Sequence, residues 1–171
     1  IDIPIGDSIA NALPRVDLPI KQGGFVTFYR QMQYFDAQGI AYRNLSAVSE
    51  AFDTSASVEH NAAALLKVLR STKKQVIIVS HSKGSLDTLE ALLGAPELVG
   101  TKVIAWVAIQ APFYGSPVAD STLAPVNGFL LEALGGNGQS VEDLKTKVRE
   151  PYIEANKVRI EALTARIPVI S

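Results

Sequence analysis

The sequence neighbours of Ser82 match a pattern that makes a serine reactive. Ser82 lies at the centre of the run "SHSKG" (80–84), between an apolar run at 75–80 and a helical pattern at 86–94. In a G-x-S-x-G turn between a strand and a helix, the serine hydroxyl is exposed above the sheet and can attack a carbonyl carbon. The pattern therefore predicts that Ser82 is a nucleophile.

The other residues of this turn have predicted roles as well. Small residues are expected two positions before and after the nucleophile, where the backbone is crowded, and here they are Ser80 and Gly84. His81 completes the turn as the immediate neighbour of Ser82. The following helix directs its N-terminus at the site, so the backbone N–H of Lys83 is predicted to stabilise an oxyanion. The alternative is a plain strand–helix junction whose serines act as caps.

A serine hydroxyl needs a base, usually a histidine that an acid orients. The two histidines, His60 and His81, both precede Ser82. His81 is the immediate neighbour of Ser82, and the turn points their side chains in different directions, so His81 cannot easily reach the Ser82 hydroxyl. His60 is interpreted as a solvated residue near the start of a helix. Asp120 lies in a loop, and Asp143 lies in a helix's first turn, where acids favour the helix dipole. We therefore predict that the catalytic base and its acid are not among the residues of this chain.

Strands alternate with helices along the sequence, which predicts a mostly parallel sheet with helices on both faces. The apolar runs 75–80 and 102–109 are typical of strands buried on both faces. Further strands are expected at 1–6, 40–45 and 167–171. Helices are expected at 25–39, 58–69 and 86–94, and from Ser140 onward until Pro151 breaks or kinks that helix. The "DTSAS" run (53–57) offers N-caps for the second of these helices, and residues 122–136 are expected to be partly helical.

Composition excludes several classes of function. The 171 residues suit one domain, and 47% hydrophobic with 19% charged residues is a globular composition. A net charge of −1 without a basic stripe argues against nucleic acid, and no apolar run reaches the roughly 18 residues of a membrane span. There is no cysteine, no cluster with metal-ligand spacing and no phosphate-binding glycine loop, so neither a metal nor a cofactor is expected. The chain begins with Ile1 and ends in an apolar run, and we expect that N- and C-terminal parts are missing.

Four runs of the sequence, in order, resemble the α/β-hydrolase superfamily and, within it, bacterial lipase-like serine esterases. They are "VIIVSHSKGSLDTLEALL", "VIAWVAIQAPFYGSPVAD", "VEDLKTKVREPYIEANK" and "IPVIS". The second run holds "GSPVAD" (115–120), which matches a G-S-x-x-A-D loop of that family. The resemblance spans about residues 40–171 and implies an α/β-hydrolase fold, incomplete here, with Ser82 as nucleophile. It also implies a second oxyanion donor from the backbone of an earlier loop, at Gly6 or alternatively at Gly24. In the family a histidine often precedes the glycine of this loop, and neither Gly6 nor Gly24 has a histidine beside it.

The resemblance implies a carboxylic ester hydrolase that acts on a small-molecule ester or a lipid without a cofactor. Residues 111–139 would form a lid or an acyl pocket that includes Phe113 and Tyr114, although apolar residues there also suit core packing. A second polypeptide or an unseen C-terminal part would supply the acid and the histidine. By the same resemblance the protein would be exported. The alternatives are a non-catalytic binding or scaffold protein on this fold and an acyltransferase.

Overall fold

The computed structural model divides the chain into two compact units, residues 1–48 and 49–171. It describes residues 20–21, 24–25, 28–45, 52–53, 55–121 and 138–171. The expected strand at 1–6, the Gly6 turn and the partly helical segment 122–136 lie outside these ranges. Each unit is described by itself.

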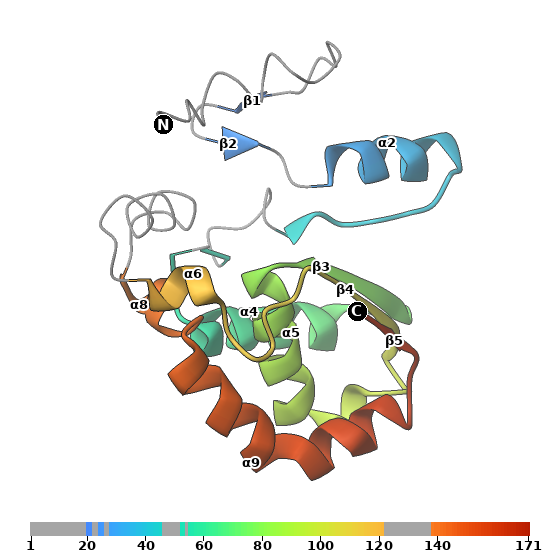
Figure 1. The fold of residues 1–171 in the computed structure, drawn as a ribbon. Coiled ribbons are helices and arrows are strands. Elements are labelled where there is room, and N and C mark those ends of the chain that lie inside the picture. The colour runs from blue at the N-terminus through green and yellow to red at the C-terminus, as the bar shows by residue number, and fades with distance from the viewer. Residues whose placement is uncertain (1–19, 22–23, 26–27, 46–51, 54, 122–137) are drawn as a thin grey trace. The chain divides into compact units, whose positions relative to one another are not determined.

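The larger unit is built on a parallel sheet of strands β3 (Val76–His81), β4 (Val103–Ile109) and β5 (Val169–Ile170), in that order. Both pairings are parallel, with Ser80 opposite Ala108 and Trp106 opposite Val169. Parallel neighbours need a crossover, and here helices provide it. The predicted mostly parallel α/β fold with helices around the sheet is confirmed (Figure 1).

The helices of this unit pack around α5 (Lys83–Gly94), which contacts β3, α4 (Val58–Ser71) and α9 (Thr146–Thr164). In Figure 1, α4 and α5 lie side by side and α9 passes next to α5. Three leucines of α5 are among the buried residues, as are apolar residues of α4 and β4. They are Leu86, Leu89, Leu93, Leu65, Leu69, Val103 and Trp106. The short elements are η1 (Pro96–Leu98), α6 (Pro117–Asp120) and α8 (Gly138–Glu142).

The expectation that β3 is buried on both faces is wrong. Ile77 is 59% exposed and Val79 is 38% exposed, while Ser80 on the opposite face is buried. Ile104 of β4 is also exposed. Alternate residues of a strand point to opposite faces, so the described helices cover one face of β3 and leave the other open.

The smaller unit holds a hairpin of β1 (Ile20–Lys21) and β2 (Gly24–Phe25), followed by α2 (Tyr29–Ala37). The predicted helix over 25–39 therefore begins four residues later than expected, because Phe25 pairs with Ile20. It ends near Gly39, as predicted, where the backbone turns with φ 66°.

Residues 40–45 do not form the predicted strand. They turn back along α2: the Tyr42 hydroxyl donates to Asp36 Oδ2 at 3.2 Å, and Asn44 Nδ2 donates to Met32 Sδ at 3.3 Å. The rings of Phe35 and Tyr42 lie 5.8 Å apart. These contacts use the side chains that a strand would present to a sheet.

The helix break expected at Pro151 falls earlier, at residues 143–145, and α9 continues through the proline. Pro151 removes one backbone N–H from the helix. Tertiary contacts hold the helix on the C-terminal side, because Ile153 is buried and the Tyr152 hydroxyl donates to Glu90 of α5.

The run 115–120 anchors the start of α9. The Ser116 N–H donates to Leu144 O at 2.8 Å. Asp120 Oδ1 accepts from the Thr146 N–H at 3.0 Å, and the Thr146 hydroxyl also donates to this carboxylate. A carboxylate there satisfies an unpaired N–H and favours the helix dipole. Gly115 lies against the backbone of Thr146 with φ 96°.

We expect Gly115→Ala to destabilise the protein by about 2 kcal/mol or more. A Cβ at this position would lie 2.5 Å from Thr146 Cα, and φ 96° is a region that only glycine adopts easily. Urea unfolding followed by circular dichroism measures the loss. Gly94→Ala is the matched control, since a Cβ there meets nothing within 4 Å. Equal midpoints for the two variants would contradict the packing argument.

Candidate functional site

Ser82 occupies the turn between β3 and α5 in a backbone conformation that few residues other than glycine adopt. Its φ is 51° and its ψ is −129°. A non-glycine residue with positive φ is uncommon and signals a turn or strain. The Ser82 side chain makes no capping hydrogen bond to α5, which speaks against the alternative in which this serine is a helix cap.

Backbone hydrogen bonds fix this turn at the carboxyl edge of the sheet. The Ser82 N–H donates to Ile109 O at the end of β4, at 2.9 Å, and Ser85 N–H donates to Ser82 O, also at 2.9 Å. Lys83 is the first residue of α5, so its backbone N–H has no acceptor within the helix. Ligands of open parallel sheets bind outside the carboxyl ends of the strands, and Ser82 lies at that edge.

Ser80 supports the turn from below through a buried chain of hydrogen bonds. The Trp106 indole Nε1–H donates to Ser80 Oγ at 2.8 Å, and Ser80 Oγ lies 2.9 Å from Ser85 Oγ. All three side chains are buried. A serine in place of the pattern's first glycine therefore links β3, β4 and α5 beneath Ser82, which the sequence pattern did not indicate.

We expect Ser80→Ala to lower the free energy of unfolding by about 1–3 kcal/mol, because the Trp106 N–H loses its buried acceptor. Trp106 is the single tryptophan of the sequence, so its emission reports this site directly and should change in the folded variant. Ser71→Ala, at an exposed position of α4, should leave both emission and stability unchanged. An unaltered spectrum for Ser80→Ala would contradict the hydrogen bond.

The predicted steric need for glycine at position 84 is not found among the described residues. A Cβ added to Gly84 would meet no atom within 4 Å, and Gly84 has no positive φ. Ser80, two residues before Ser82, is buried instead.

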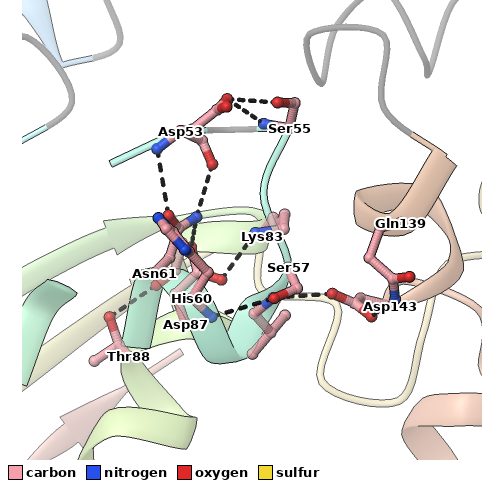
Figure 2. A network of polar contacts seen from close by, with 12 residues as sticks. Asp53, Ser55, Ser57, His60, Asn61, Lys83, Asp87, Thr88, Gln139 and Asp143 are labelled. Carbon is pink, nitrogen blue, oxygen red and sulfur yellow. Dashed lines mark hydrogen bonds and ion pairs between the residues drawn. The ribbon is translucent and has the colours of Figure 1, made fainter. Parts of the chain in front are cut away.

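Lys83 belongs to a buried polar network that sequence reasoning missed (Figure 2). Its ammonium donates to Asp87 Oδ1 at 3.0 Å, one helical turn further along α5. Asn61 of α4 donates from Nδ2 to Asp87 Oδ2 at 3.0 Å and to Asp53 O at 2.9 Å. Burial raises the pKa of the Asp87 carboxyl, and Lys83 opposes that rise. The i,i+4 spacing of Lys83 and Asp87 was the available signal, but it does not tell a buried pair from a solvated one.

The structure brings neither the histidines nor the loop acids into a catalytic arrangement with Ser82. His60 is exposed in the first turn of α4, and its N–H donates to the Ser57 hydroxyl, the predicted N-cap, at 3.2 Å. His81 Nε2 hydrogen-bonds to Gln110 Oε1 at 2.9 Å. Asp120 holds the start of α9, as described above.

Asp143 holds the start of α4 in the same way. Its Oδ2 accepts from the Val58 N–H at 2.9 Å, and its Oδ1 accepts from Gln139 Nε2 at 2.9 Å (Figure 2). Asp120, which ends α6, and Asp143, which follows α8, therefore both have structural partners.

The residues assigned to a pocket separate in the structure. Phe113 packs on the core cluster that contains Leu86 and Leu144, and its ring meets Trp106 edge-on at 5.7 Å. Tyr114 is 60% exposed. Gly24 lies in β2 of the smaller unit. No group of His, Asp and Glu among the described residues could hold a metal ion, and none of the described helices could cross a membrane.

These features define an α/β protein with a serine in the strand–helix turn at the carboxyl edge of a parallel sheet. No protein-family model matches the chain, and no curated protein does. It is similar to two crystal structures of the Bacillus licheniformis lipase BlEst2. The mature form is 25% identical with a TM-score of 0.48, over 64% of this chain and 44% of that chain. The propeptide form is 22% identical with a TM-score of 0.48, over 71% of this chain and 26% of that chain. The chain thus spans less than half of either structure.

Proposed function

We propose that this chain is part of an α/β-hydrolase-type serine hydrolase that cleaves carboxylic esters through an acyl-enzyme on Ser82. The backbone of Ser82 carries the proposal: a serine with φ 51°, directly between a strand of the parallel sheet and a helix, whose side chain does not cap that helix. Such strain persists only where the surroundings enforce it, and it is concentrated at functional sites. The motif resemblance of the surrounding sequence supports the same function.

The proposed reaction uses Ser82 Oγ as nucleophile. A base removes the hydroxyl proton while Oγ attacks the ester carbonyl carbon, and the oxygen that becomes negative accepts from the Lys83 backbone N–H. The C–O bond to the alcohol then breaks, and the alcohol leaves with the proton. Water attacks the acyl-enzyme in the same way, which releases the acid and regenerates Ser82.

The base and its acid are proposed to come from outside these 171 residues. The chain's histidines are His60 and His81, of which the first is exposed in α4 and the second hydrogen-bonds to Gln110. Asp120 and Asp143 each hold a helix N-terminus. A second oxyanion donor at Gly6, or at Gly24, and an acyl pocket or lid within 111–139 remain parts of this proposal. The substrate would be a small-molecule ester or a lipid.

Fluorophosphonate labelling of the whole protein tests the function. The reagent reacts with activated serines, and mass spectrometry of the digest locates the adduct. An adduct on the peptide that contains Ser82 is expected. A whole protein that carries no adduct on that peptide would instead be a binding or scaffold protein. The 171-residue chain alone should label far more slowly, and equal labelling would contradict an external base.

A further inference from the structure

A pocket lies between the N-terminus of α4, the middle of α5 and the first turns of α9, and Ser82 is not among its lining residues. The pocket has a volume of about 410 Å³. Glu90, which contributes to its wall, follows Ser82 by eight residues on α5, a rise of about 12 Å along a helix. The pocket is therefore distinct from the proposed nucleophile site. Figure 2 includes part of its lining, with Ser57, Gln139 and Asp143 close together.

Arg149 of α9 lines this pocket with a guanidinium that is poorly satisfied. Arg149 is only 4% exposed, and its guanidinium stacks on the ring of Tyr152, with Cζ 4.3 Å from the ring centroid. Within the described residues its hydrogen bond runs from Nε to Phe113 O at 3.4 Å, and the buried Nη2 has no partner. Burial lowers the pKa of this guanidinium, so holding the charge here is costly. A buried donor of this kind calls for an acceptor.

Carboxylates line the same pocket and outnumber the guanidinium. Both oxygens of Asp143 are occupied, and Glu90 Oε2 accepts from the Tyr152 hydroxyl. Glu59, in the first turn of α4, is exposed. A simple anion would be repelled by these carboxylates, whereas a simple cation would leave the Arg149 donors unpaired.

We propose that this pocket binds a small zwitterion, a molecule with a carboxylate next to an ammonium group, such as a free α-amino acid. The ligand's carboxylate accepts from the Arg149 guanidinium, whose buried Nη2 must turn toward the pocket when the ligand binds. Its ammonium group donates to Glu59 and Glu90. Because charge-assisted hydrogen bonds form at both ends, tight binding requires both the carboxylate and the ammonium group of the ligand.

Thermal unfolding with a matched set of ligands tests this proposal. The probes are glycine, alanine and leucine, together with 4-methylpentanoate, which is leucine without its ammonium, and 3-methylbutylamine, which is leucine without its carboxylate. A bound ligand raises the melting temperature according to its affinity. At least one amino acid should bind at millimolar concentration. If leucine binds, it should bind about tenfold tighter than either of its single-ended analogues.

Variants assign the two ends of the ligand. Arg149→Met should abolish the shift while it keeps the protein folded, since it removes a poorly paired buried charge. Glu59→Gln, at an exposed position, should weaken amino-acid binding about tenfold, and Glu154→Gln on the outer face of α9 is its control. Ser82→Ala should bind as the unaltered protein does, which separates this pocket from the proposed hydrolase site.

Two results would overturn the proposal. One is a single-ended analogue that binds as tightly as leucine, which would make the pocket a plain anion or cation site. The other is the absence of any shift with all three amino acids, which would make Arg149 a purely structural residue. Glu59→Gln keeps the test decisive if Arg149→Met fails to fold.

Discussion

Replacing Ser82 with alanine is expected to abolish fluorophosphonate labelling and to lower ester hydrolysis by the whole protein by a factor on the order of 10⁵–10⁶. Ser82→Gly should lose activity to the same extent, yet it should be more stable than Ser82→Ala by about 1 kcal/mol. Glycine adopts φ 51° without a Cβ clash, whereas alanine retains the strain. The two variants should therefore be equally inactive but differ in stability, as expected if the strain at position 82 is kept for function.

Labelling kinetics and urea unfolding measure the two effects on the same preparations. Ser71→Ala, which changes an exposed serine of α4, should leave both unchanged. If Ser82→Ala still formed an adduct on the same peptide, another residue would be the nucleophile. Equal stability of the alanine and glycine variants would mean that the turn stores no strain.

Removing one partner of the buried Lys83–Asp87 pair should be the largest perturbation of stability. Asp87→Leu leaves the Lys83 ammonium, whose side chain is only 5% exposed, without its carboxylate. Such an unpaired buried charge costs about 3–5 kcal/mol. The double variant Lys83→Met/Asp87→Leu removes both charges and should recover most of this loss. Chemical denaturation of the four proteins in this cycle measures the coupling, and additive losses would contradict it.

The same pair gives the variant Lys83→Met a defined pH dependence. Burial raises the pKa of Asp87 and Lys83 is the largest opposing influence, so the pKa should rise further without the lysine. A raised pKa in the folded state means that the folded protein holds the proton more tightly than the unfolded chain. The variant should therefore be most stable below the ordinary Asp pKa and lose stability as pH rises through the raised value. Adding Asp87→Asn should remove this dependence, and its persistence would place the titration elsewhere.

Local signals in the sequence were enough to predict several of the helices and strands. The apolar, β-branched runs predicted β3 and β4, the leucine spacing predicted α4 and α5, and Ser57 caps α4 as its position suggested. The strand–serine–helix order of the elbow was also visible, because the neighbours that define it lie within a few residues of Ser82. Such signals depend on backbone propensity and periodicity, which short stretches of sequence contain.

The partners of the polar residues around this elbow depend on long-range packing instead. Asp120 and Asp143 cap helices that begin 26 residues later and 85 residues earlier in the chain. Ser80 accepts from Trp106 across 26 residues, and Lys83 is buried because α4 brings Asn61 over Asp87. The strand predicted at 40–45 was wrong, and Pro151 does not break the helix predicted around it, for the same reason: side-chain contacts with α2 and α5 outweigh the local preference. A side chain's partner depends on which elements pack together, and no local pattern of residues specifies that.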